Sequence, residues 1–93
     1  MFIAIAIHHA APEYADEFID FMHKVIDAAR DSPGLLEFTA CRDPRNGVLA
    51  GFSRWESADA FQAALPTISS LGPLRKPEWS TRPDELITLV EAA

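Results

Sequence analysis

The sequence has little cysteine, little positive charge and no long apolar run, and each shortage narrows the range of functions. The one cysteine, Cys41, allows no disulfide framework, so we expect a buried structural thiol in a protein of the reducing cytoplasm. Eight Lys and Arg residues stand against 14 Asp and Glu, and the net charge of −6 disfavours nucleic-acid partners and anionic membrane surfaces. The apolar run at residues 2–7 is too short for a membrane span and predicts a strand instead of a signal peptide.

Several motifs that mark enzymes are also missing. The sequence contains no Gly-rich phosphate loop, no GxSxG and no CxxC. All three histidines, His8, His9 and His23, lie in the first quarter of the chain. A metal site that combines His8 with Glu13 or Asp16 is one alternative, but the spacing fits no metal signature, so we predict no metal site.

What is present is enough for one domain over residues 1–93, with 48% hydrophobic residues. Alternating and helical apolar periodicities predict the order strand, helix, strand, strand, helix, strand. The expected strands are 2–9, 35–42, 48–55 and 85–91, and the expected helices run from Pro12 to the stop at 32–34 and over 58–65.

Turn and cap residues set most of these bounds. Asn46-Gly47 suits a hairpin, and Ser57 suits the cap of the second helix. Pro66 is expected to end that helix. Residues 66–83 hold four of the seven prolines and are predicted to form a loop ordered by proline, with a helical turn near residues 68–71.

With right-handed crossovers, this order of elements predicts an α+β fold. The expected form is a ferredoxin-like βαββαβ antiparallel sheet, strand order 4-1-3-2, with both helices on one face. The other face would expose Ile3, Ile5 and Ile7. Such an apolar patch does not stay in water, so we expect a second copy of the chain to cover it in a two-fold homodimer.

Three segments resemble a known family. They are Ser-Pro-Gly-Leu-Leu-Glu-Phe at 32–38, Arg-Asp-Pro at 42–44 and Arg-Trp-Glu-Ser-Ala-Asp-Ala-Phe at 54–61. Together with the apolar first strand and the long helix, they are similar to the antibiotic biosynthesis monooxygenase domain, over most of residues 2–65. The resemblance implies the dimeric α+β barrel, in which two ferredoxin-like sheets face each other. Members of this family include cofactor-free oxygenases of phenols or quinols, heme-degrading enzymes and isomerases.

The heme-degrading branch of the family is disfavoured here. The resemblance implies that heme-degrading members carry Asn on the first strand, Trp in the second helix and a His ligand after it. Those positions fall approximately on Ala6, Ala64 and Leu74, and no histidine follows His23. A histidine that family members often carry early in the second helix is also absent. We therefore predict that the protein has no cofactor and does not bind heme as those relatives do.

The residue types point to one candidate catalytic group and several candidate binding groups. His8 ends the first strand beside Ala4 and Ala6, whose small side chains allow either close helix packing or a cavity. If there is a cavity, His8 can act as a base near neutral pH, with Ala6 lining the site.

Aromatic and basic residues supply the other candidates for substrate binding. Trp55 serves either as a core or interface residue or as a stacking wall for a planar substrate, with Phe61 beside it on the second helix. Arg75 and Trp79 belong either to a solvated loop or to a lid that suits an anionic planar substrate.

Two functions remain open from the sequence. The first is a small cofactor-independent monooxygenase acting on a phenolic or quinol-type compound, in which the substrate anion itself reduces O₂. The second is a non-catalytic, ligand-binding or stress-related dimer of the same fold. In either case we expect a small aromatic molecule and a second copy of the chain as partners.

Overall fold

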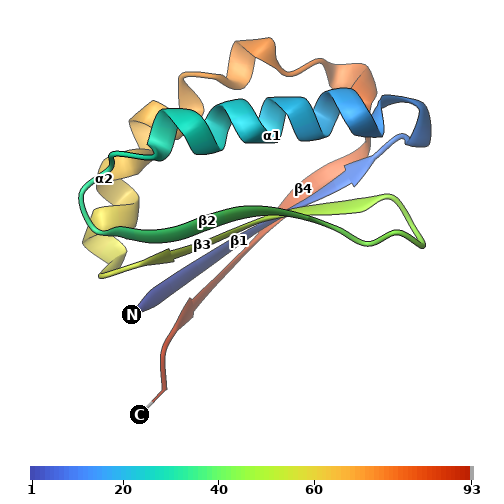
Figure 1. The fold of residues 1–93 in the computed structure, drawn as a ribbon. Coiled ribbons are helices and arrows are strands. Elements are labelled where there is room, and N and C mark those ends of the chain that lie inside the picture. The colour runs from blue at the N-terminus through green and yellow to red at the C-terminus, as the bar shows by residue number, and fades with distance from the viewer. Residues whose placement is uncertain (93) are drawn as a thin grey trace.

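The computed structural model describes residues 1–92 and has the predicted α+β fold. The elements, in chain order, are β1 (Phe2–Ala10), α1 (Ala15–Ala29), β2 (Leu35–Arg42), β3 (Val48–Trp55), α2 (Ala58–Ser69) and β4 (Ser80–Val90). The strands form one antiparallel sheet in the order β2-β3-β1-β4, and both helices cover the same face (Figure 1). The predicted ferredoxin-like βαββαβ arrangement is therefore confirmed.

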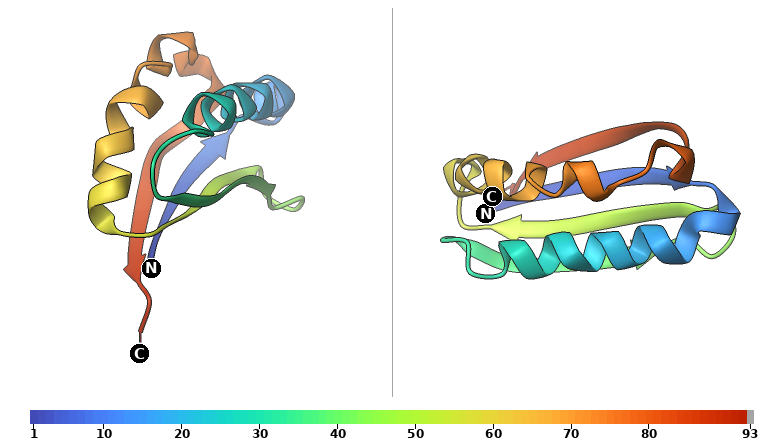
Figure 2. Two further views of the ribbon diagram at one scale, coloured as in Figure 1. Left: turned by 60° about the vertical axis from the view of Figure 1, so that its left-hand side comes forward. Right: turned by 90° about the horizontal axis from the view of Figure 1, so that it is seen from above.

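Short 3₁₀ turns complete the helical layer. They lie at Pro12–Tyr14, before α1, and at Gly72–Leu74 and Pro77–Trp79, between α2 and β4. The two views of Figure 2 show the segment after α2 running beside α1 over the sheet. Trp79 fixes this segment in place, because its buried ring packs on Phe18 and Phe21 of α1.

Gly34 forms a turn that no other residue would fit. It has a φ of +82°, in the region that favours glycine, and a side chain there would approach the Cβ of Ala60 to 2.7 Å. Its carbonyl accepts a hydrogen bond from the backbone N–H of Glu56 over 2.8 Å. Ser57 then caps α2 as predicted, because its hydroxyl accepts from the N–H of Ala60.

The second helix is longer than predicted. The expectation that Pro66 ends it is wrong, because α2 continues through Pro66 to Ser69. Proline removes one backbone hydrogen bond inside a helix. Here its ring lies on the exposed side, while Leu65 and Ile68 pack against the buried cluster around Trp55. Burial of these two side chains offsets the lost bond and keeps the last turn helical.

The last strand is also longer than predicted. β4 begins at Ser80, so much of the expected loop over 66–83 is helix, 3₁₀ turn or strand. Pro83 lies inside β4, which is possible because β4 is at the edge of the sheet, where one row of N–H groups has no ladder partner.

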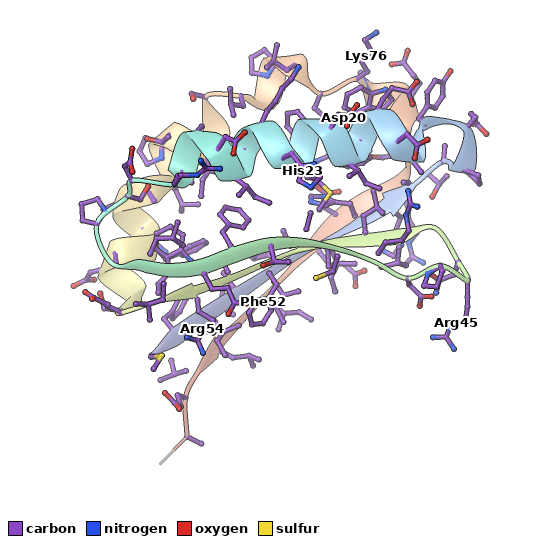
Figure 3. The ribbon with its side chains drawn as sticks, in the orientation of Figure 1. Asp20, His23, Arg45, Phe52, Arg54 and Lys76 are labelled. Atoms are coloured by element: carbon purple, nitrogen blue, oxygen red, sulfur yellow. The ribbon has the colours of Figure 1, made fainter. Side chains whose placement is uncertain are left out.

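The opposite face of the sheet carries no helix. Figure 3 shows Phe52 and Arg54 projecting from β3 away from the helices. Their neighbours in the strand register on this face include Ile3 and Ile5 of β1 and Ile87 of β4. The expectation that Cys41 is buried is wrong: it alternates with the helix-facing residues of β2 and is exposed. No helix within residues 1–92 is long and apolar enough to cross a membrane.

Candidate functional site

A cavity of about 270 Å³ lies between the sheet and the helical layer. Every strand, both helices and the segment after α2 contribute to its walls. The lining residues are Ala4, Ala6, His8, Phe21, Met22, Val25, Ile26, Phe38, Gly51, Ser53, Phe61, Leu65, Ile68, Gly72, Arg75 and Leu86. Most of these side chains are apolar, so a ligand here would leave water for a hydrocarbon surface with a few polar groups.

Small residues on the sheet make room for this cavity. Ala6 pairs directly with Gly51 on the neighbouring strand, and Ala4 pairs with Ser53. Because directly paired residues share a face of the sheet, all four point toward the helices. Of the two alternatives for Ala4 and Ala6, the structure therefore has the cavity instead of close helix packing.

His8 is the one imidazole in the cavity wall among residues 1–92. Its ring packs on Phe18 of α1, with the ring centroids 4.9 Å apart, and its side chain is 13% exposed. Nδ1 lies 3.1 Å from Oδ2 of Asp84, but the contact is bent, so Nδ1 has no aligned hydrogen bond. Burial lowers the pKa of His8 below its ordinary value of 6.5, although the nearby Asp84 carboxylate acts in the opposite direction.

Asp84 faces His8 and also accepts hydrogen bonds from Arg75. Both terminal nitrogens of the guanidinium donate to the carboxylate, and the Nη2–Oδ1 distance is 2.7 Å. Nη2 also donates to the Ser80 hydroxyl over 2.8 Å, and the guanidinium carbon lies 4.8 Å from the centre of the Phe18 ring. Burial raises the pKa of Asp84, but the hydrogen bonds from Arg75 and the close contact with His8 outweigh it, and the pKa lies below its ordinary value.

The structure brings together four of the six candidate residues. Ala6, His8, Phe61 and Arg75 all line the cavity. Trp55 does not line it, because the indole is fully buried between β3 and α2, with its ring centroid 5.7 Å from that of Phe61. Trp79 is also buried and lies outside the lining, behind Phe18 and Phe21.

Asp84 is the site residue that the sequence prediction missed. The strand register gives the signal that would have found it, since Ile7 pairs with Glu85 and the next residue of β1 is His8. The prediction started the last strand at residue 85, one position too late for Asp84 to appear opposite His8.

A second depression, of about 610 Å³, is larger but less suited to chemistry. It lies between the end of α1 and the start of α2 and is open to solvent, with small residues and the carboxylates of Asp31, Glu56 and Asp59 around it. No aromatic or imidazole group lines it. No group of three or more His, Cys, Asp or Glu side chains in the described chain is arranged to hold a metal ion. We therefore place the candidate site in the cavity between the sheet and the helical layer.

The family model for antibiotic biosynthesis monooxygenase matches residues 1–67 of the sequence. The chain belongs to this family. The match ends inside α2, so the family assignment covers β1, Gly34 and the β3–α2 corner but not Arg75 or Asp84. No protein with a curated description matches the chain.

Solved structures share the fold of the whole chain. One described as an antibiotic biosynthesis monooxygenase has a TM-score of 0.82 at 18% identity, with all of both chains covered. A conserved protein from Methanosarcina mazei has a TM-score of 0.86 at 15% identity, over 98% of this chain and 92% of its own. A variant of MhuD, solved with two manganese protoporphyrin IX molecules per active site, has a TM-score of 0.80 at 21% identity, over 100% of this chain and 96% of its own. At these identities the likeness shows the fold.

The three positions that the heme comparison singled out have different surroundings in this family member. Ala6 lines the cavity, Ala64 is buried in the core, and Leu74 is 52% exposed in the 3₁₀ turn after α2. The imidazole that the cavity does offer belongs to β1, with one nitrogen facing Asp84.

Proposed function

We propose that the protein is a small cofactor-independent monooxygenase that acts on a phenolic or quinol-type aromatic compound. One observation carries the proposal: a lone imidazole, whose pKa burial lowers, stands in the wall of a mostly apolar cavity. Such an imidazole is neutral at pH 7 and is ready to accept a proton. The volume of about 270 Å³ is near the lower end of small-molecule sites, roughly 300–1,000 Å³, and favours a compact planar ligand.

The proposed reaction begins with proton transfer from the phenol to Nε2 of His8. The electron-rich phenolate then reduces O₂, and a carbon–oxygen bond forms to give a hydroperoxide once the proton has returned. Loss of the remaining C–H proton and cleavage of the O–O bond release water and leave a quinone. One oxygen atom enters the product and the other leaves as water, so the substrate loses four electrons and O₂ gains four. The protein contributes deprotonation and a dry cavity.

The charges around the cavity favour a substrate that enters uncharged. Arg75 is the one cation in the lining, and both of its terminal nitrogens already donate to Asp84. A substrate carboxylate or sulfonate would have to displace Asp84 or remain unpaired beside apolar side chains, which is costly. We therefore expect neutral phenols and quinols to bind better than permanently anionic analogues, and Arg75 not to act as a free anion receptor.

We propose further that two copies of the chain pair through the open face of the sheet. Phe52, Ile3 and Ile5 lie together there, with Ile87 of β4 at 42% exposure and Leu89 at 48%. A contiguous apolar face of this kind favours an isologous partner, because the same patch on a second copy is complementary to it.

An oxygen-electrode screen tests the enzyme. Purified protein in metal-free buffer is mixed with hydroquinones and naphthols, and oxygen uptake is compared with the protein-free rate. We expect uptake with at least one compound, and a loss of about 10²-fold or more in His8→Gln. His9→Gln is the matched control, since His9 faces away from the cavity and contacts Glu85.

Three results would each contradict part of the proposal. No uptake above the protein-free rate across the panel would favour the non-catalytic, ligand-binding dimer instead. Uptake that is the same in wild type and His8→Gln would exclude His8 as the base. Sulfonated naphthols that react as well as naphthol would contradict the preference for uncharged substrates.

A further inference from the structure

We propose that Asp84 is a positioning residue for His8, which holds the imidazole with its proton on Nδ1 so that Nε2 keeps a free lone pair. The geometry carries this inference: Nδ1 is buried and faces Oδ2 of Asp84 at 3.1 Å. The inference rests on the proposed function in one respect: the proton that Nε2 accepts is that of the proposed substrate.

The β1–β4 register brings the two side chains together beside a β-bulge. The β1–β4 register shifts between Ile7 and His9, whose partners on β4 are Glu85 and Arg82. One residue of β1, His8, therefore faces two residues of β4, Pro83 and Asp84. Pro83 has no N–H and cannot join the ladder, so the bulge forms there, next to Asp84. Asp84 alternates along β4 with Leu86 and Thr88, which pair with the helix-facing Ala6 and Ala4, so it lies on the helix-facing side of the sheet next to the bulge.

Arg75 keeps the carboxylate in place. The two-pronged hydrogen bond to Asp84 fixes the plane of the carboxylate, and the third hydrogen bond, to Ser80, fixes the guanidinium. The guanidinium and the imidazole both pack on Phe18 of α1. Rotation of Asp84 away from His8 would break two charge-assisted hydrogen bonds, which favours the arrangement in which the carboxylate faces Nδ1.

The bent contact between His8 and Asp84 fits this role. Hydrogen bonds at catalytic groups are often poorly aligned without substrate and tighten when it binds. A carboxylate can only accept, so it selects the tautomer with the proton on Nδ1. When Nε2 takes a proton, the imidazolium faces the negative Asp84, which stabilises it as it forms. The charged groups that act on His8 are Asp84, Arg75 and His9, and of these only Asp84 favours the imidazolium.

Nuclear magnetic resonance of histidine labelled with nitrogen-15 tests the inference without any substrate. In the wild-type protein at pH 7.5, we expect the His8 nitrogen shifts to show Nδ1 protonated and Nε2 unprotonated. In Asp84→Asn we expect a mixture of tautomers and a further fall in the pKa of His8, because the amide can accept or donate and carries no charge. Glu85→Gln is the matched control, since Glu85 contacts His9 on the other face and should leave the His8 shifts unchanged.

Two outcomes would overturn the role of Asp84. One is a wild-type His8 protonated on Nε2, which needs no variant and so remains decisive even if Asp84→Asn does not fold. The other is a folded Asp84→Asn in which the tautomer and the pKa of His8 are both unchanged. If the oxygen screen finds a substrate, Asp84→Asn should lower kcat by about 10²- to 10⁴-fold with little change in KM. If no substrate reacts, the predicted tautomer supports the positioning role while the monooxygenase proposal fails.

Discussion

Trp55 and Ser53 stand two residues apart on β3 and share a buried hydrogen bond. Nε1 of the indole donates to the Ser53 hydroxyl over 2.9 Å, and the hydroxyl donates onward to the carbonyl of Ala4 on β1 over 3.2 Å. Both side chains are at most 4% exposed. The serine therefore satisfies the one polar side-chain atom of the largest fully buried residue.

Ser53→Ala should destabilise the protein by about 1–3 kcal/mol, because it leaves Nε1 of Trp55 buried without an acceptor. Urea unfolding followed by tryptophan fluorescence measures the change. Ser69→Ala, at an exposed position near the end of α2, is the control and should change the free energy of unfolding by less than about 0.5 kcal/mol. Equal effects of the two substitutions would mean that another group satisfies the indole.

The stability of the protein should fall in mild acid because of His8. Its pKa is lowered in the folded state, chiefly by burial, so below about pH 6.5 the unfolded chain takes up a proton that the folded chain resists. The contribution of the neutral His8 side chain to the free energy of unfolding is fully present above pH 6.5 and is lost as the pH falls toward the pKa of His8 in the folded state. Asp84, also with a lowered pKa, loses its contribution only below its ordinary value of 3.8.

Urea unfolding at a series of pH values between 7.5 and 5 tests this prediction. The free energy of unfolding of the wild-type protein should decrease over this range, and in His8→Gln the decrease should be smaller. His23→Gln changes an exposed histidine of α1 and should keep the wild-type decrease. Parallel curves for wild type and His8→Gln would show that His8 titrates alike in the folded and unfolded states.

Local sequence signals predicted the elements well where the cause of each element was itself local. The bounds of β2 and β3, the turn at Gly34 and the cap at Ser57 all agree with the structure. The same approach failed at Pro66, where a local rule that proline ends helices was outweighed by burial of Leu65 and Ile68. Tertiary packing of this kind leaves no trace in a short window of sequence.

The part of the candidate site that lies on one strand could be predicted from the sequence, and the part that depends on tertiary structure could not. His8 and Ala6 could be placed together because they alternate along one strand. Asp84 is 76 residues away in the chain from His8, and only the β1–β4 register brings it close. Trp55 and Trp79 were chosen for their chemistry, but a large ring fills the core as readily as it lines a cavity.

Filling the cavity should weaken ligand binding without unfolding the protein. Ala6 lies on the cavity floor, opposite Gly51, so the ring in Ala6→Phe would extend into existing space. We expect 1-naphthol, followed by its own fluorescence, to bind the wild-type protein and to bind Ala6→Phe at least tenfold more weakly. Ala63→Phe, at an exposed position on α2, should bind like wild type. Unchanged binding in a folded Ala6→Phe would place the ligand elsewhere.

A charge on the open face of the sheet should separate the proposed dimer. Phe52 is directly opposite Ile5 on β1 and Thr39 on β2, near the middle of the face. We expect the wild-type mass at micromolar concentration, by light scattering after gel filtration, to be that of two chains. Phe52→Glu should reduce it to that of one chain, because the carboxylate would be buried unpaired. Leu74→Glu, on an apolar residue that is 52% exposed after α2, should leave two chains. A single-chain mass for the wild type would contradict the dimer.

The protein should not bind heme as the heme-degrading members of its family do. A family-like iron ligand would have to come from the segment after α2, where Leu74 stands beside Pro73 in a 3₁₀ turn and no histidine is present. Titration with hemin should therefore give no sharp, stoichiometric shift of the Soret band. His8 lines the cavity and His9 lies on the opposite face, so a weak shift removed by His8→Gln or His9→Gln would be adventitious binding. A sharp shift at one or two hemin per chain that persists in both variants, and vanishes on a substitution within residues 70–79, would contradict the prediction.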